Sequence, residues 1–247
     1  MRLDGKVALL SGVGPNMGRA TAILYAKEGC SVALVARKEE SLQETLSIIE
    51  GIGGTAIIIL GDVSKREDSL RIVEETEKRL GGIDILYSGA GGFFDPEREF
   101  ADVDDSFWKM ALSNTLDGPL NLTQAILPVM KLNGGGSIIL VTASFSVRQA
   151  SNSAYAAAKG GVLSFGQNLS KELYHDNIRV NIIEPGLIRT RVGEKGEDID
   201  PGTKLNRQGH AMDVAHAALY FGSDESSWVT GQVLSIDGGV DVRARQL

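Results

Sequence analysis

The hydrophobic positions along the chain follow two different spacings. Short continuous apolar runs, rich in β-branched residues, alternate with longer stretches in which apolar residues recur every three or four positions. Continuous runs are typical of strands that are buried on both faces, and the second spacing is typical of helices with one apolar face. The pattern therefore predicts an α/β protein with a parallel sheet covered by helices on both faces.

The same pattern places the individual elements. The expected strands are Val7–Ser11, Val32–Ala36, Thr55–Leu60, Ile83–Tyr87, Ser137–Thr142, Arg179–Ile183 and Gln232–Ile236. The expected helices are Gly18–Gly29, Glu39–Glu50, Lys65–Leu80, Asp105–Thr115, Leu120–Leu132, Ala154–Tyr174 and Met212–Phe221. The chain shows no repeat or linker, so we expect one domain over residues 1–247, with a mobile substrate loop at 190–210.

Composition excludes several classes of protein. The single cysteine, Cys30, cannot form an intrachain disulfide, which fits a reducing, cytoplasmic setting. The net charge of −7 is spread among interspersed acids and bases, whereas nucleic-acid binding needs a concentrated basic face. No apolar run is long enough to span a membrane, and the first strand begins too early to leave room for a signal peptide. The three histidines lack metal-ligand spacing, so we expect a small-molecule partner and no metal.

A glycine-rich turn, Ser11–Gly18, joins the first strand to the first helix. Glycines let backbone N–H groups approach a pyrophosphate, and the helix N-terminus adds the positive end of its dipole. Gly12 and Gly18 are six residues apart with Gly14 between them, which differs from the usual dinucleotide spacing. The turn predicts a dinucleotide site, and the alternative is an ordinary tight strand-to-helix connection.

The end of the second strand bears on the choice of dinucleotide. NAD sites place an acidic residue there to bind the ribose 2′-hydroxyl, but this chain has Arg37 and Lys38. Two cations would neutralise a 2′-phosphate, which favours NADP(H) over NAD(H). The alternative is that both are solvated residues at the start of a helix.

Tyr155 and Lys159 are four residues apart in a strongly helical stretch, so their side chains share one helix face. The pKa of a free tyrosine is about 10, too high for a base at neutral pH. A fixed cation nearby would lower it and make the phenol a general acid or base.

Together these motifs resemble the short-chain dehydrogenase/reductase family, in its single-domain branch, from about Lys6 to Gly239. Beyond Tyr155 and Lys159, which match Y-x-x-x-K, several other segments match in order. They are Ser11–Gly18 (T-G-x-x-x-G-x-G), Asp62-Val63 (D-V), Ser88–Gly91 (N-N-A-G), Asn114, Arg179-Val180-Asn181, Pro185-Gly186, Thr190 and Asp237-Gly238-Gly239. The resemblance implies a doubly wound Rossmann fold with a seven-stranded, mostly parallel sheet. It also implies a homotetramer, or a dimer, assembled through Leu120–Leu132 and Ala154–Tyr174.

The resemblance also implies roles. Tyr155 would transfer the proton, Lys159 would bind the nicotinamide ribose and keep Tyr155 acidic, and Asn114 would hold a water that links Lys159 to solvent. The residues expected to bind the cofactor are Gly12, Gly14, Asn16, Met17, Gly18, Arg37, Asp62, Val63, Ala90, Gly91, Tyr155, Lys159, Pro185, Gly186, Ile188 and Thr190.

Three positions depart from the family pattern. Asn16 replaces a glycine, and we expect it to tolerate left-handed backbone there. Ser88-Gly89 replaces an Asn-Asn pair and removes side-chain hydrogen bonds. The catalytic serine usually precedes the tyrosine by thirteen residues, where this chain has Thr142. We favour Ser144 as the residue that orients the substrate, with Thr142 as the alternative and Ser146 as a third candidate.

The sequence thus predicts an oxidoreductase that transfers hydride between NADP(H) and a carbonyl or secondary alcohol. The overall pattern is similar to 3-oxoacyl-thioester reductases. The alternatives are an enzyme acting on a sugar, steroid or cyclic ketone, and a non-catalytic dinucleotide-binding protein of the same fold.

Overall fold

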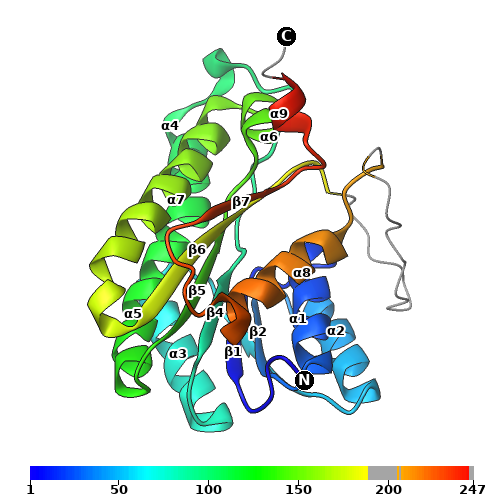
Figure 1. Ribbon diagram of the computed structural model, residues 1–247. Helices are drawn as coiled ribbons and strands as arrows, with labels where there is room; N and C mark the ends of the chain where they lie inside the picture. Colours follow the sequence, from blue (N-terminus) through cyan, green and yellow to red (C-terminus); the bar gives the residue numbers. More distant parts are fainter. Residues whose placement is uncertain (189–204, 206, 245–247) are drawn as a thin grey trace.

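The fold is a seven-stranded parallel sheet with helices on both faces, seen in a computed structural model (Figure 1). The structure describes residues 1–188, 205 and 207–244. The strand order is β3-β2-β1-β4-β5-β6-β7, and every pair of neighbours runs parallel. The predicted doubly wound Rossmann fold is therefore confirmed.

The strands and helices lie close to their predicted positions. The strands are β1 Val7–Ser11, β2 Ser31–Ala36, β3 Thr55–Leu60, β4 Ile85–Ser88, β5 Gly136–Val141, β6 Ile178–Pro185 and β7 Val233–Ile236. The helices are α1 Met17–Lys27, α2 Glu40–Gly51, α3 Arg66–Leu80, α4 Asp105–Leu112, α5 Gly118–Leu132, α6 Phe145–Gln149, α7 Ser153–Glu172, α8 Ala211–Gly222 and α9 Val240–Ala244.

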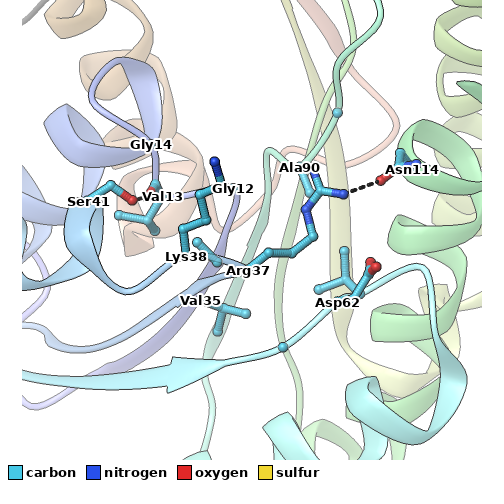
Figure 2. A pocket seen from close by; sticks show the side chains of 14 residues that line it. Gly12, Val13, Gly14, Val35, Arg37, Lys38, Ser41, Asp62, Ala90 and Asn114 are labelled. Carbon is cyan, nitrogen blue, oxygen red and sulfur yellow. Dashed lines mark hydrogen bonds between the residues drawn. The ribbon is translucent and has the colours of Figure 1, made fainter.

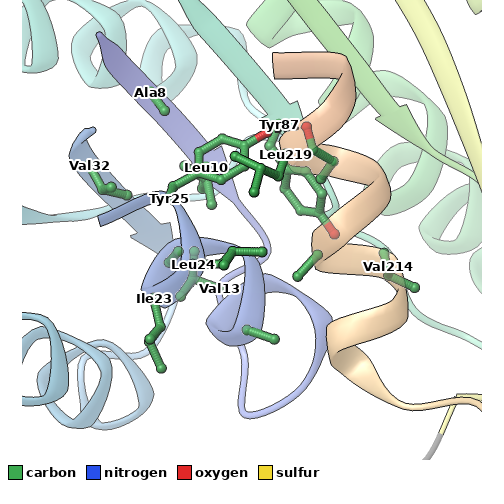
Figure 3. Close-up of a cluster of buried hydrophobic side chains, with 14 of the residues drawn as sticks. Ala8, Leu10, Val13, Ile23, Leu24, Tyr25, Val32, Tyr87, Val214 and Leu219 are labelled. Carbon is green, nitrogen blue, oxygen red and sulfur yellow. Dashed lines mark hydrogen bonds between the residues drawn. The ribbon is translucent and has the colours of Figure 1, made fainter. Parts of the chain in front are cut away.

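Each face of the sheet has its own apolar cluster because successive strand residues point to opposite faces. In β1, Leu10 joins the cluster formed with α1, α2 and α8, whereas Leu9 joins the cluster formed with α3, α5 and α7. Figure 3 shows the first cluster, in which Tyr25 of α1 lies against α8. The Tyr25 hydroxyl donates to the carbonyl of Ala218 at 2.7 Å, so this buried polar group is paired.

The strand order reverses beside β1, because the chain adds β2 and β3 on one side and β4 to β7 on the other. In open parallel sheets, ligands bind outside the carboxyl ends of the strands at such a switch point. The glycine-rich turn after β1 and the loop after β4 both lie at this edge. The fold therefore places the candidate cofactor and catalytic segments together.

The structure differs from the prediction in two places, and a third prediction is not tested. The helices predicted at Asp105–Thr115 and Leu120–Leu132 are joined, because a π-helical turn, Ser113–Asp117, connects α4 to α5. The five-residue helices α6 and α9 were not predicted, since five residues are too few to show a helical period. The loop predicted at 190–210 lies mostly outside the described residues.

Across the described residues, none of the helices is both long enough and apolar enough to cross a bilayer.

Candidate functional site

The glycine-rich turn passes very close to the loop that follows β4. Gly12 has a φ of +77°, and a Cβ there would lie 2.5 Å from the amide nitrogen of Ala90. A Cβ on Gly18 would lie 2.4 Å from the carbonyl oxygen of Gly12. Both positions therefore require glycine. A Cβ on Gly14 would meet no atom within 4 Å, which leaves open space beside the turn.

Asn16 does not adopt the left-handed backbone that we expected of it. Its φ is −124°, so the residue does not need the conformational freedom of glycine. Its side-chain oxygen is buried and has no hydrogen-bond partner within the described residues. Asn16 is the N-cap residue of α1, which begins at Met17 and continues through Gly18. The predicted cofactor residues of this segment thus lie at the N-terminus of the first helix.

A cavity of about 320 Å³ opens beside this turn (Figure 2). Its walls are Gly12, Val13, Gly14, Val35, Ala36, Arg37, Lys38, Ser41, Gly61, Asp62, Val63, Ala90, Gly91 and Asn114. The structure therefore brings together seven of the predicted cofactor residues and Asn114. The motifs did not identify Val13, Val35, Ala36, Ser41 and Gly61. The position of Val13, Val35, Ala36 and Gly61 at the carboxyl ends of β1, β2 and β3 is the signal that could have found them, whereas Ser41 lies in the first turn of α2.

Arg37 extends across this cavity from the end of β2 (Figure 2). Its guanidinium donates to the side-chain oxygen of Asn114 at 3.2 Å. The Asn114 amide in turn donates to the carbonyl of Met110 at 2.9 Å. The side-chain hydrogen bonds of Asn114 thus run to Arg37 and Met110, and its predicted link to Lys159 through water stays a prediction.

Tyr155 lies in the first turn of α7, which Asn152 caps. The Asn152 side chain accepts from the amide of Tyr155 at 2.9 Å and donates to the carbonyl of Phe93 at 2.7 Å. Phe93 has a φ of +71°, a strained conformation for an aromatic residue that the Asn152 bond helps to hold. Phe94 packs edge-on against the Tyr155 ring with centroids 5.7 Å apart. The loop after β4 and the start of α7 therefore position the phenol together.

Lys159 lies one turn further along α7, with its ammonium inside the protein. Nζ donates to the carbonyl of Val141, the last residue of β5, at 3.1 Å. A Cβ on Gly91 would lie 3.1 Å from this Nζ, so the ammonium lies beside a wall of the 320 Å³ cavity, which we call the cofactor cavity because seven predicted cofactor residues line it. Burial lowers the pKa of Lys159 to about 8.

The environment of the Tyr155 hydroxyl differs from our expectation. Burial raises its pKa to about 12, and the cation that opposes this shift is Arg148 rather than Lys159. Desolvation disfavours the phenolate, and in this structure it outweighs the nearby positive charge. The expected role of Lys159 in keeping Tyr155 acidic therefore stays a prediction.

The three hydroxyl candidates have different surroundings. The Thr142 hydroxyl donates to the backbone carbonyl of Lys159 at 2.6 Å, which ties β5 to α7. Ser144 is the N-cap residue of α6, and its hydroxyl lies 3.1 Å from that of Ser146. The Thr142 hydroxyl thus meets a backbone carbonyl and the Ser144 hydroxyl meets another hydroxyl, and the preference for Ser144 over Thr142 stays a prediction.

The predicted nicotinamide segment follows β6. Gly186 donates its amide to Ile236 at 2.9 Å, and a Cβ on it would lie 2.8 Å from Asp237, so this strand end packs against β7. Ile188 pairs with Gly209 in an isolated bridge. Neither they nor Pro185 line the 320 Å³ cavity. Thr190 lies outside the described residues.

No group of three potential metal ligands from histidine, cysteine, aspartate and glutamate occurs within the described part of the chain.

Comparisons with known proteins agree over nearly the whole chain. The family described as enoyl-(acyl carrier protein) reductase matches residues 12–241. The 3-oxoacyl-(acyl-carrier-protein) reductase FabG of Thermotoga maritima is 34% identical over 246 residues, covering 97% of this chain and 99% of the relative. A solved short-chain type dehydrogenase/reductase from Mycobacterium marinum is 30% identical with a TM-score of 0.85, covering 96% of this chain and 95% of that one.

The chain belongs to the short-chain dehydrogenase/reductase family. It is an NAD(P)-dependent oxidoreductase, as the sequence motifs predicted. Another solved member, a 7α-hydroxysteroid dehydrogenase in complex with NADH and 7-oxoglycochenodeoxycholic acid, is 29% identical with a TM-score of 0.85. It covers 96% of this chain, and this chain covers 95% of it.

The residues of this short-chain dehydrogenase/reductase fit a dinucleotide. The glycine turn leads directly into α1, which begins at Met17, and the first turn of a helix offers backbone N–H donors that suit a pyrophosphate. The Lys159 ammonium has three N–H groups, and within the described residues one of them donates to Val141. The other two can donate to ribose hydroxyls.

Replacing the buried lysine should stabilise the protein. The pKa of Lys159 is about 8 in the folded protein and 10.5 as a free side chain, so the unfolded chain binds its proton more tightly. We expect Lys159→Met to raise the thermal unfolding midpoint at pH 7 by at least about 2 °C, the shift that about 1 kcal/mol gives in a domain of this size.

The difference in unfolding midpoint between Lys159→Met and wild type should shrink as the pH rises from 8 towards 10.5, because the wild-type lysine then loses its charge in the folded protein. Lys171→Met, at an exposed position on the same helix, is the control and should leave the midpoint nearly unchanged. A lower midpoint for Lys159→Met than for wild type at pH 7 would contradict this account.

Proposed function

We propose that the protein is an NADP(H)-dependent carbonyl reductase or alcohol dehydrogenase in which Tyr155 transfers the proton. The observation that carries the proposal is the placement of Tyr155 and Lys159 one turn apart on α7, with the Lys159 ammonium beside Gly91 in the wall of the cofactor cavity. Intact Tyr155, Lys159 and Asn114 argue against a non-catalytic dinucleotide-binding protein.

When bound, NADPH would supply a hydride for the carbonyl carbon. The residues expected to hold it are the glycine turn, Asp62-Val63, Ala90-Gly91 and the segment from Pro185 to Thr190, of which residues 189 and 190 lie outside the described residues. Ser144 donates a hydrogen bond to the carbonyl oxygen and orients it. Tyr155 donates its proton to the same oxygen as negative charge develops there. In the direction of oxidation, Tyr155 must first be the phenolate, which then accepts the proton from the alcohol and becomes the neutral phenol.

Two charges favour NADP(H) over NAD(H). Arg37 and Lys38 both line the cavity at the end of β2, where an acidic residue would bind an unphosphorylated ribose. Ser41 lies on the same wall, and its hydroxyl donates to the carbonyl of Val13 at 3.3 Å. A 2′-phosphate placed here would meet two cations.

The substrate is a ketone with an apolar flank. Phe94 is 44% exposed beside Tyr155, and Phe145, which follows Ser144, is 46% exposed. These rings suit an acyl chain, and the similarity to FabG of Thermotoga maritima supports a 3-oxoacyl thioester. The same rings also suit a steroid or another cyclic ketone, which the hydroxysteroid dehydrogenase likeness favours.

The organisation of the chain is part of the same proposal. Residues 1–247 form one oxidoreductase domain, and the substrate loop expected at 190–210 lies mostly outside the described residues. Two copies meet through α5 and α7 in a homotetramer or dimer, as the family resemblance implies.

The proposed proton transfer is tested by Tyr155→Phe, which removes only the hydroxyl. We expect at least about a 100-fold loss of kcat, because a positioned acid contributes that much, while the Kd for NADPH stays within about twofold of wild type. NADPH absorbance with acetoacetyl thioesters, cyclic ketones and sugars measures the rate. Tyr174→Phe, at an exposed tyrosine beyond α7, is the control. Full activity in Tyr155→Phe would rule out the proposed role.

The cofactor preference is tested by Arg37→Ala. We expect NADPH to bind about 10- to 100-fold more weakly, because each hydrogen bond to a charged group contributes about 1.5–3 kcal/mol. Binding of NADH, measured by fluorescence titration, should change little and serves as the internal control. Equal losses for both cofactors would show that Arg37 does not recognise the 2′-phosphate.

A further inference from the structure

The C-terminal segment folds back against the short helix that follows Ser144 (Figure 1). Asp237 organises the turn that makes this possible. Its carboxylate accepts from the amide of Gly239 at 2.8 Å and from the amide of Asp241 at 2.7 Å. Gly238 and Gly239 both have positive φ angles, +65° and +79°, which favour glycine at these positions. The chain then enters α9, where Asp241 faces α6.

The Asp241 carboxylate binds both of the first two backbone N–H groups of α6. One oxygen accepts from Phe145 at 2.7 Å and the other accepts from Ser146 at 2.9 Å. These N–H groups have no partner inside the helix, because the first turn of any helix leaves its donors free. Asp241 is only 6% exposed, so the carboxylate is held in place by these bonds rather than by water.

Ser144 is fixed by the same turn of helix. Its amide donates to Pro185 at 2.8 Å, and its carbonyl accepts from Arg148 at 3.0 Å. Its hydroxyl lies 3.1 Å from the hydroxyl of Ser146, whose own amide is bound by Asp241. A change in the direction of the first turn would therefore move the Ser144 hydroxyl.

The other end of α6 has a separate attachment. The Arg148 side chain binds the carbonyl of Ala143 and forms an ion pair with Glu184 of β6. Glu184 also accepts from the hydroxyl of Ser235 on β7 at 3.3 Å. This pair joins α6 to the sheet, but it does not satisfy the N–H groups of Phe145 and Ser146. Asp241 supplies the acceptors that set the N-terminal turn.

We propose that Asp241 is a positioning residue for the reaction, acting through the first turn of α6 to aim the Ser144 hydroxyl at the substrate oxygen. This inference rests on the proposed function, in which Ser144 orients the carbonyl. Asp241 lies beyond the Asp-Gly-Gly motif and outside the catalytic residues that the motifs identify.

The charge of Asp241 is consistent with this role. Burial alone would raise the pKa of its carboxyl, but hydrogen bonds from Ser146 and Phe145 and the charge of Arg148 hold the pKa below its usual value. The group is therefore an anion at neutral pH, and an anion at a helix N-terminus is stabilised by the helix dipole.

The test is Asp241→Asn, which preserves the shape of the side chain. An amide offers one acceptor oxygen and points its NH₂ group at the second backbone N–H, so the first turn must shift. We expect kcat to fall about 10-fold, since small misplacements of a catalytic group carry penalties of this order or larger. The Kd for NADPH should stay within about twofold of wild type. Val242→Ala, at an exposed position on the same helix, should leave kcat unchanged.

A double-mutant cycle with Ser144→Ala separates positioning from a general structural effect. If Asp241 acts through Ser144, then Asp241→Asn should cause almost no further loss of kcat once the hydroxyl is absent. An unchanged kcat in the single Asp241→Asn variant would overturn the inference. A loss of about 10-fold that persists in the Ser144→Ala background would overturn it equally, because Asp241 would then act by another route.

The two proposals fail in different ways. If wild-type protein reduces no ketone, or if Tyr155→Phe retains full activity, the proposed function fails. A crystal structure of Asp241→Asn then decides the positioning claim by itself. A displaced Ser144 hydroxyl would support it, and an unmoved one would overturn it.

Discussion

The buried ammonium of Lys159 is the constraint on which the candidate site depends. It lies inside the protein, donates to the last carbonyl of β5 and borders the cofactor cavity beside Gly91. A charge in this position is unfavourable by itself, and burial lowers its pKa to about 8. The Thr142 hydroxyl bonds the Lys159 carbonyl and fixes this turn of α7 against the sheet. Tyr155 lies one turn before Lys159 on the same face of α7. The hydrogen bonds that fix Lys159 against β5 therefore also help to position the phenol.

The two halves of the site are built by different kinds of interaction. The cofactor half depends on short stretches of backbone after β1, β2 and β4, and above all on the close approach that Gly12 allows. The catalytic half depends on contacts between distant segments. Asn152 ties the loop after β4 to the start of α7, and Asp241 ties the C-terminal segment to α6. Substitutions in the second half should therefore change the rate of reaction more than the affinity for cofactor.

This division explains what could be predicted from the sequence. Both ends of β1 and of β3 were predicted correctly, because each strand is a continuous apolar run between polar turns. Helical spacing alone predicted that Tyr155 and Lys159 lie one turn apart on one helix. The helices α6 and α9 could not be predicted, because five residues carry no period and tertiary hydrogen bonds hold them. The backbone of Asn16 and the hydrogen bond between Arg37 and Asn114 also depend on neighbours far away in the chain.

Burial lowers the acidity of Tyr155 in this structure, so the proposed proton transfer requires that the bound oxidised cofactor lower the pKa of the phenol again, through the positive charge of its nicotinamide ring. The direct measurement is the difference in ultraviolet absorbance between wild type and Tyr155→Phe, which reports ionisation of the Tyr155 phenol, recorded as a function of pH with and without NADP⁺. With its pKa raised to about 12, Tyr155 should show no ionisation below about pH 10 in the free protein. With NADP⁺ bound, the account predicts ionisation several pH units lower. The same titration curve in both states would contradict it.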